Sequence, residues 1–263
     1  MKQLMTSHRS ETVAVAVAMT LLSATAQAAV LGFNGNQELA GWQYNQTDTG
    51  TPLQIVGDNA IQFTAGPNNR RSLWFTTPQD ITQFEANFTY RASSISASAS
   101  RQGLAFVIQN SPSGVTTLGG ASYGYNGITP SAAVTIETDS GPGRSFTGYY
   151  TNGVLGGGSA DMTPVNAYEF TDIDVNVRYQ GSVLSVTMTQ GTDVFGPRNY
   201  FVGSLASLLG SPTAYVGFTG ATLNTQGAGG GATQFLSNFS FVPEPTTGVA
   251  MLVGLMALRQ VRR

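Results

Sequence analysis

The sequence predicts an all-β protein, a sandwich of two antiparallel sheets, on three observations. Hydrophobic residues recur at every second position, as in Phe84, Ala86, Phe88 and Tyr90, which is the period of a strand with one buried face. The chain has 32 glycines and 11 prolines, and many of them lie between such runs, where they favour turns. Helical periodicity is almost absent. Many short strands joined by glycine-rich turns are typical of sandwiches and barrels.

The N-terminal 28 residues have the features of a secretory signal peptide. Lys2 and Arg9 supply positive charge, residues 12–25 are apolar or small, and Ala26-Gln27-Ala28 has the small-x-small pattern that signal peptidase cleaves. The apolar stretch is shorter than the roughly 20 residues that a membrane span needs. We therefore expect residues 1–28 to be a hydrophobic signal helix that is removed; the alternative is an N-terminus that stays uncleaved.

Residues 29–242 form the one predicted domain, with strand patterns along its length. Gln180-Gly181 separates two alternating runs and indicates a hairpin turn. Residues 204–209 favour one short helix, and the glycine-rich stretches 153–158 and 227–231 are expected to be loops. The expected strands are residues 60–65, 72–76, 84–91, 103–109, 133–139, 172–178, 184–189, 214–221 and 233–241.

Residues 243–263 have the features of a second signal, a short membrane segment. Val242-Pro243-Glu244-Pro245 ends the preceding strand, because proline cannot donate to a β ladder. An apolar stretch over residues 246–258 follows, and three arginines close the chain. Such a basic excess beside a short hydrophobic segment stays cytoplasmic. We therefore expect a hydrophobic C-terminal helix that anchors the chain transiently in a membrane.

The order Pro-Glu-Pro, hydrophobic stretch and basic cluster resembles the PEP-CTERM sorting signal. The resemblance implies a Gram-negative envelope, in which the export machinery and an exosortase handle the chain during maturation. It also implies cleavage near Pro243 and delivery to the cell outer surface or the extracellular matrix. The alternative is an ordinary C-terminal anchor that is never cut, since both segments share a short apolar stretch.

The residue types that are missing exclude several classes of site. The chain has no Cys, its one His is His8 and its one Lys is Lys2, so both lie in the predicted signal peptide. The domain therefore has no Ser-His-Asp or Cys-His nucleophile, no zinc site built on His or Cys, and no disulfide framework. Carboxylates outnumber arginines in the domain, so nothing suggests a nucleic-acid partner. A bound metal would need oxygen ligands, which favours calcium.

Several segments of the domain, in order, resemble the L-type (legume) lectin domain, a concanavalin-like jelly roll. Residues 103–109, GLAFVIQ, resemble the family's Asp-Gly-Leu-Ala-Phe strand. Residues 119–139 resemble its Gly-Gly loop, its Gly-Tyr-x-Gly-Ile turn and its metal strand. Residues 70–91 resemble the early strands, while residues 172–188 and 214–222 resemble the late hairpin and the strand before the specificity loop. The resemblance implies this fold for most of the domain.

Glu137 and Asp139 are the candidate metal ligands. Residues two apart on a strand share a face, roughly 6.6 Å apart, and two neighbouring carboxylates repel each other without a cation. The Glu-x-Asp pair matches the lectin metal motif, so the resemblance implies calcium there. The family's next ligands, Asn and Asp, are replaced by Gly143 and Thr147, and Asp161 or loop carbonyls would have to complete the oxygens that calcium takes. The alternative is a pair of solvated carboxylates.

The resemblance places the sugar contacts at Gln102, Gly119, Gly120 and Tyr125. Gln102 stands where the family has an Asp, and its amide can donate to and accept from sugar hydroxyls. Gly119 or Gly120 would supply a backbone N–H, and Tyr125 is one of several loop tyrosines whose rings could stack on a pyranose face. The loop over residues 222–231 would set specificity. For Gln102 the alternative is an ordinary exposed loop residue.

An enzymatic alternative depends on a second acidic residue near Glu137. Laminarinase-type glycoside hydrolases share the sandwich and carry Glu-x-Asp-x-x-Glu, but here the pattern runs Glu137, Asp139, Pro142, and proline cannot transfer a proton. Asp172 and Asp174 share a strand face and are expected to be solvated. We therefore expect a non-enzymatic, exported protein of the envelope or matrix that binds polysaccharide or another glycan. The alternative is a structural surface module that has lost its sugar pocket.

Overall fold

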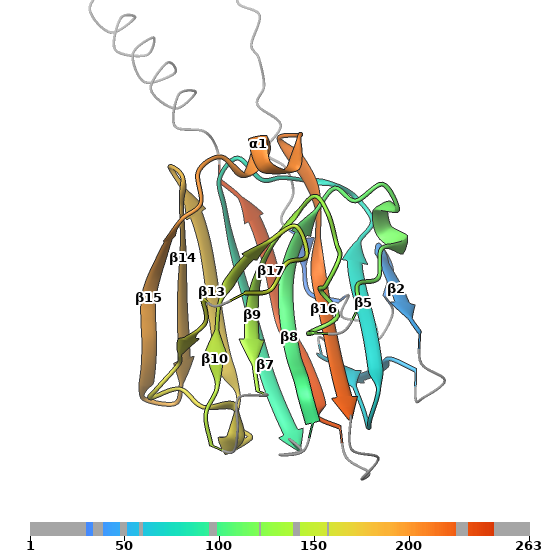
Figure 1. Cartoon of the computed structure of the whole chain (residues 1–263), viewed down its shortest axis with the longest axis vertical. Coiled ribbons are helices and arrows are strands. Elements are labelled where there is room, and N and C mark those ends of the chain that lie inside the picture. Colours follow the sequence, from blue (N-terminus) through green and yellow to red (C-terminus); the bar gives the residue numbers. More distant parts are fainter. Residues whose placement is uncertain are drawn as a thin grey trace, which may run out of the picture.

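The computed structural model describes residues 30–33, 39–47, 52–57, 60–94, 99–120, 122–138, 143–156, 158–224 and 231–244. These residues form two antiparallel sheets packed face to face, which confirms the predicted sandwich (Figure 1). The two predicted signal helices lie outside the described residues, apart from Pro243 and Glu244. Within the described part, no helix is long and apolar enough to cross a membrane.

One sheet has eight strands in the order β15-β14-β13-β7-β17-β4-β3, with β1 paired to β17. The last described strand, β17, therefore lies inside this sheet between β7 and β4. The strands are β1 (Val30–Leu31), β3 (Gln54–Gly57), β4 (Ala60–Thr64), β7 (Phe84–Ser94), β13 (Ile173–Gln180), β14 (Val183–Gln190), β15 (Asp193–Phe201) and β17 (Thr233–Pro243).

The other sheet has nine strands in the order β12-β10-β9-β8-β16-β5-β2, with β11 paired to β9 and β6 paired to β16. Two 3-10 helices, η1 (Gly114–Thr116) and η2 (Ala167–Glu169), lie in its connections. The strands are β2 (Trp42–Gln46), β5 (Asn69–Phe75), β6 (Gln79–Asp80), β8 (Ala99–Gln109), β9 (Ser131–Glu137), β10 (Phe146–Thr147), β11 (Tyr149–Thr151), β12 (Ala160–Asp161) and β16 (Thr213–Asn224).

Aromatic rings from both sheets fill the main core. Phe218 of the nine-stranded sheet lies 5.1 Å from Phe88 and 5.0 Å from Phe239 of the eight-stranded sheet, between ring centroids and in edge-to-face geometry. Trp42 packs on Phe239 at 5.5 Å, as expected for a core tryptophan. Such aromatic pairs contribute about 0.5–1.5 kcal/mol beyond the area they bury, so they hold the sheets together directly.

A second, smaller core covers the face of the nine-stranded sheet that points away from its partner sheet. Trp74 projects from β5 onto this face, and its indole N–H donates to the Thr117 carbonyl at 2.7 Å. The chain between β8 and β9 folds back over the sheet and buries its own rings there. Besides Trp74, this second core contains Ala105, Val107, Tyr123, Tyr125, Ile128, Ala133 and Tyr150.

Most expected elements are present, with shifted ends. The short helix is α1 (Leu205–Leu209), capped by Ser204, whose side chain accepts from Ser207 N–H, and it is followed by Gly210 in the left-handed region. The predicted hairpin joins β13 to β14 through Gly181 and Ser182, both with positive φ.

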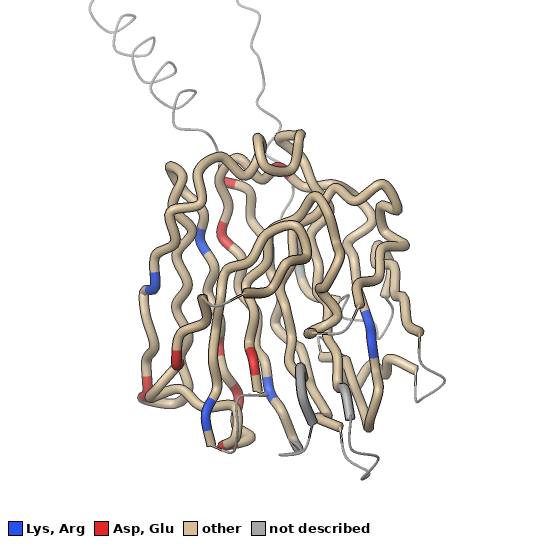
Figure 2. Tube along the Cα trace, viewed as in Figure 1, with Lys and Arg blue, Asp and Glu red and all other residues tan. Residues whose placement is uncertain are grey.

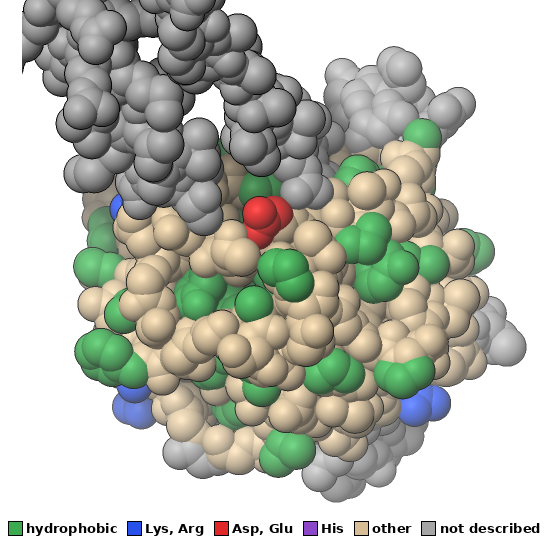
Figure 3. All heavy atoms as spheres, turned by 90° about the horizontal axis from the view of Figure 1, so that it is seen from above, with side chains coloured by type: hydrophobic (Ala, Val, Ile, Leu, Met, Phe, Trp, Pro, Cys, Tyr) green, Lys and Arg blue, Asp and Glu red, His purple; other side chains and the backbone are tan. Residues whose placement is uncertain are grey.

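Seen from the α1 end, hydrophobic side chains of the described residues lie in separate spots among polar ones (Figure 3).

Candidate functional site

The candidate site lies where β8 begins and β9 ends, at the end of the sandwich opposite α1 (Figure 1). Antiparallel pairing places Gly103 of β8 opposite Glu137 of β9. Both the N–H and the side-chain hydroxyl of Thr138 donate to the Gln102 carbonyl, at 3.1 and 3.0 Å. The register therefore brings the predicted metal ligand Glu137 and the predicted sugar contact Gln102 to one place.

Glu137 is a buried carboxylate that accepts hydrogen bonds from two hydroxyl groups. Glu137 is 5% exposed. Its Oε1 accepts hydrogen bonds from Thr135 Oγ1 at 2.7 Å and from the Tyr150 hydroxyl at 2.9 Å. Burial, and then the negative charge of Glu137, raise the pKa of the Tyr150 hydroxyl. Tyr150 therefore stays protonated at neutral pH, and its proton stabilises the carboxylate.

Strand periodicity and two glycines build this arrangement. Thr135 and Glu137 are two residues apart on β9, so they share the face that carries the second core. A Cβ on Gly148 would lie 2.6 Å from the Tyr150 ring, so glycine there makes room for the ring to reach Glu137. A Cβ on Gly103 would lie 2.1 Å from the Ile136 carbonyl oxygen, so β8 can approach β9 at this point only with glycine.

The described residues do not fit a calcium ion at this end of the sheet. Calcium takes six to eight oxygen ligands, usually with several carboxylates. Across the residues that the structure describes, no three His, Cys, Asp or Glu side chains are grouped so that they could hold a metal. Glu137 Oε1 is engaged by two hydroxyl groups, and the other predicted ligand, Asp139, lies outside the described residues.

Gln102 is fully buried on β8, so the alternative of an exposed loop residue is wrong. The ladder between β8 and β16 is irregular just beside it, where Ala221 pairs with Gly103 but Leu223 pairs with Ser100. Strand patterning alone could not show this burial, because the bulge breaks the alternation of faces. Gln102 is therefore a buried residue next to the Gly103–Glu137 pair, and it presents no exposed surface for the predicted sugar contact.

Gly119, Gly120 and Tyr125 belong to the segment that folds over the sheet and forms the second core. A Cβ on Gly119 would lie 2.2 Å from the Gly124 carbonyl oxygen, and the Gly120 N–H donates to Asn126 at 2.7 Å. Tyr125 is fully buried, and its hydroxyl lies 2.8 Å from Ser131 Oγ. The Gly120 N–H and the Tyr125 ring therefore have internal partners, and neither offers an exposed surface for the predicted sugar contact.

Sequence patterns missed the hydroxyl partners of Glu137. Thr135 could have been found from its spacing, because it shares a strand face with Glu137. Tyr150 lies on β11, and its pairing with Ala133 has no local signal in the sequence. The connections over residues 95–98, 139–142 and 225–230, which join strands at this end, lie outside the described residues.

Comparison with known proteins identifies the fold. No protein-family model matches the chain, and no curated protein matches it in sequence. A lectin from Bauhinia forficata in complex with GalNAc has a similar structure, with a TM-score of 0.61 and 17% identity over 82% of this chain and 97% of that one. The sandwich has the legume-lectin fold. The predicted concanavalin-like jelly roll is confirmed.

Two further lectin-like structures share the fold. Arcelin-5, a lectin-like defence protein from Phaseolus vulgaris, matches with a TM-score of 0.63 and 15% identity over 83% of this chain and 99% of that one. Lectin I from Ulex europaeus, in complex with the methyl glycoside of α-L-fucose, matches with a TM-score of 0.60 and 16% identity over 82% of this chain and 98% of that one. At such low identity the likeness shows the fold alone.

Proposed function

We propose that this protein is a lectin-like carbohydrate-binding protein that holds a glycan at the end of the nine-stranded sheet. The observation that carries the proposal is the strand register, which brings Gln102 and Glu137 together in a legume-lectin fold. Two of the compared structures, the Bauhinia forficata lectin and Ulex europaeus lectin I, are complexes with a sugar or a glycoside. Their likeness supports a glycan as the partner here.

Binding, rather than catalysis, is the action that these residues support. Thr135 and Tyr150 hold the buried Glu137 carboxylate in a fixed orientation, and a preorganised site loses little entropy when it binds a ligand. The enzymatic alternative would need a second carboxylate as partner, and residue 142 is proline. The compared structures, all lectins or lectin-like, support the same choice.

We propose further that glycan binding here does not depend on calcium. In a protein interior, a carboxylate is stabilised either by a cation or by hydrogen-bond donors. The hydroxyls of Thr135 and Tyr150 already stabilise Glu137, and Gly143 and Thr147 stand where the family supplies metal ligands. A chelator should therefore leave both the melting temperature and the glycan affinity unchanged.

We also propose that the sandwich is exported and released between two cleaved signals. The first described strand, β1, begins at Val30, close after the predicted cleavage at Ala28, and β17 ends at Pro243, where the Pro-Glu-Pro sequence begins. The folded sandwich therefore fills the interval between the two predicted cleavage points. Mass spectrometry of the protein from its host would test this, since an intact mass for residues 1–263 would contradict it.

The glycan-binding test is calorimetric titration of the protein with a panel of polysaccharides, each with calcium and again with chelator. Glu137→Gln should weaken binding about 10-fold, because a charge-assisted hydrogen bond is replaced by a neutral one. Glu169→Gln is the matched control, since Glu169 lies exposed on η2 and should bind like the unchanged protein. Equal affinities for the two variants would contradict the proposed site, and binding lost on chelation would contradict calcium independence.

A further inference from the structure

A cavity lined by polar residues together with Phe88 and Val175 lies on the outer face of the eight-stranded sheet, the sheet that does not carry the candidate lectin site. It has a volume of about 320 Å³, at the lower end of the range of small-molecule sites. Four adjacent strands, β14, β13, β7 and β17, supply its walls. The lining residues are Asn87, Phe88, Thr89, Asp174, Val175, Asn176, Thr187, Thr189 and Asn238.

Strand register arranges the polar side chains of this cavity in two rows across the sheet. In one row Asp174 pairs with Thr189 on one side and with Thr89 on the other; in the next, Asn176 pairs with Thr187 and with Asn87. Neighbouring strands lie about 4.8 Å apart, and the two rows lie roughly 6.6 Å apart along the strands. These two rows therefore place hydroxyl, amide and carboxylate groups in a regular array within the cavity.

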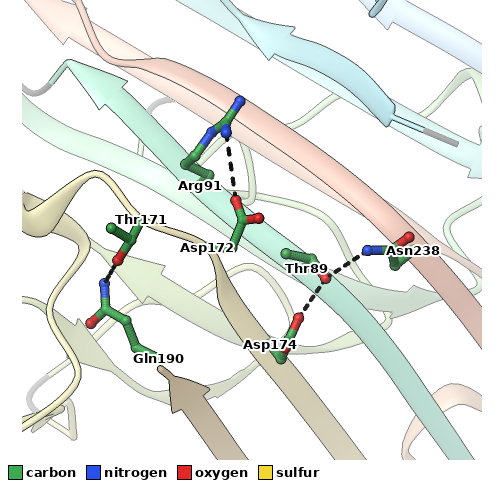
Figure 4. Close-up of polar contacts among 7 residues, drawn as sticks. All are labelled: Thr89, Arg91, Thr171, Asp172, Asp174, Gln190 and Asn238. Carbon is green, nitrogen blue, oxygen red and sulfur yellow. Dashed lines mark hydrogen bonds and ion pairs between the residues drawn. The ribbon is translucent and has the colours of Figure 1, made fainter. Parts of the chain in front are cut away.

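A bulge in β17 raises one wall of the cavity. The ladder between β17 and β7 shifts between Ser237 and Ser240, and Asn238 adopts a positive φ of 53°. Asn238 donates from its amide to Thr89 Oγ1 at 3.2 Å, and Thr89 donates to Asp174 Oδ1 at 2.6 Å (Figure 4). This chain of hydrogen bonds fixes the orientation of the carboxylate, so the wall and floor are ordered before any ligand arrives.

Several groups that face the cavity have no hydrogen-bond partner within the described part of the chain. Asp174 uses only Oδ1, and Asn176 donates from Nδ2 to Asn87 Oδ1 and Glu85 Oε1, each at 2.7 Å. The second oxygen of Asp174, the Asn176 side-chain oxygen, the Asn87 amide N–H₂ and the hydroxyls of Thr187 and Thr189 are left open. The array therefore offers donors and acceptors side by side, as a polyhydroxyl ligand requires.

The charges around the cavity favour a neutral ligand. Arg91, on the same face, pairs with Asp172 at 3.7 Å and lies over the Phe235 ring, and Arg178 pairs with Glu244 at 3.2 Å (Figure 4 shows the first pair). No Lys or Arg is among the residues that line the cavity, and its one charged group is the Asp174 carboxylate. Phosphate, sulfate or uronate groups would be repelled there.

We propose that this cavity is a second glycan site, which takes a short segment of a neutral oligosaccharide. It is separate from the lectin-like site at the strand ends, and its argument does not depend on that site. A neutral sugar presents hydroxyls that both donate and accept, and so matches the open groups of the two rows. A divalent cation would find one carboxylate, which is too few ligands for calcium or magnesium.

The test is calorimetric titration of the full chain with maltohexaose, cellohexaose and mannohexaose, with hexagalacturonate as the acidic comparison. At least one neutral hexasaccharide should bind. Asp174→Asn should weaken it about 10-fold, since a hydrogen bond to a charged group is lost, and Asn87→Ala should weaken it roughly threefold. Asp172→Asn is the matched control: the same change just before the start of β13, at a residue that does not line the cavity, should alter affinity less than twofold.

The other outcomes separate this proposal from the lectin-like site. Loss of binding in Glu137→Gln with full binding in Asp174→Asn would overturn the cavity and leave the strand-end site standing. The reverse result would support the cavity and contradict the strand-end site. The proposal would be overturned if hexagalacturonate or calcium alone bound more tightly than the neutral hexasaccharides. It would also be overturned if no neutral hexasaccharide bound. A sedimentation shift in Asp174→Asn without a change in affinity would overturn it too, because it would show that this face joins two copies of the chain.

Discussion

At the scale of single residues, the hydrogen bond of a buried hydroxyl decides whether that group stabilises the fold. Tyr149 and Tyr150 are neighbours on β11, and strand alternation sends them to opposite faces of the sheet. Tyr150 donates to Glu137 at 2.9 Å, whereas the Tyr149 hydroxyl is buried with no partner in the described part of the chain. An unpaired buried hydroxyl loses its hydrogen bonds to water on folding, and no protein hydrogen bond compensates for this loss of free energy.

The two tyrosines therefore predict opposite effects for the same substitution. Tyr150→Phe should lower the free energy of unfolding by about 1–3 kcal/mol, because the buried Glu137 carboxylate loses a donor. Tyr149→Phe should leave it unchanged or raise it slightly, since a desolvated hydroxyl is removed. Urea denaturation of both variants measures the difference. Equal losses would show that both hydroxyls are bonded in solution.

Prediction from sequence was weakest at this scale. The sequence pointed to Glu137 and Gln102, and the register brings them together, but burial and internal partners were not visible in the pattern. Gln102 lies beside a bulge, and Tyr125 lies in a segment that folds back onto the sheet, so neither follows the alternation of a regular strand. Their surroundings depend on residues distant in sequence, such as Tyr150 for Tyr125 and Ala221 for Gln102.

At the scale of elements, close contact between strands and rings depends on residues without side chains. Gly217 lies in β16 between β5 and β8, and a Cβ there would lie 2.1 Å from the Leu73 carbonyl oxygen and 2.7 Å from the Trp74 ring. Glycine thus lets the indole of Trp74 pack closely against the neighbouring strand. The second core requires this approach.

Gly217→Ala should consequently destabilise the protein by about 3 kcal/mol, the upper part of the range for overpacked sites. Gly156→Ala is the control, since Gly156 is exposed, has no atom within 4 Å of the added carbon and needs no positive φ. Thermal melting of the two variants tests the argument, with about 2–4 °C expected per kcal/mol. A Gly217→Ala protein that melts with the unchanged one would contradict the close packing of Trp74.

Elements with one buried face were predictable, and those without one were not. Ile173, Val175 and Val177 alternate with polar residues, and β13 follows that pattern closely. β15 was missed because it is an edge strand that is mostly exposed on both faces, so its sequence carries no alternation. The two-residue strands β10 and β12 are too short for any periodic signal.

At the scale of the whole molecule, the titration of buried tyrosines governs the response to alkaline pH. Burial is the main cause that raises the pKa values of Tyr90, Tyr125, Tyr149, Tyr150 and Tyr200 above the ordinary value of 10.0. Charged residues are sparse over the sandwich (Figure 2). Tyrosines are therefore the main groups whose ionisation could change the stability of the sandwich at alkaline pH.

The sign follows from proton binding in the two states. Above pH 10 the unfolded chain loses its tyrosine protons while the folded protein keeps them, so the unfolded state gains stability. The free energy of unfolding should keep its maximum value below pH 10, and it should fall steeply as the pH rises through the raised pKa values of the tyrosines. Melting curves between pH 8 and pH 12, with tyrosinate absorbance recorded alongside, measure this. Complete titration of the tyrosines near pH 10 in a protein that stays folded would contradict it.

The position of β17 also constrains the order in which this chain acquires its structure. β17 pairs with β7, β4 and β1, so these three strands cannot complete their pairing until β17, the last described strand, is present. During synthesis from the N-terminus, the eight-stranded sheet stays split, with β4 and β7 presenting open edges, until residues 233–243 become available. The eight-stranded sheet is thus completed late, and a ribosome or a translocation channel that still holds β17 keeps that sheet open.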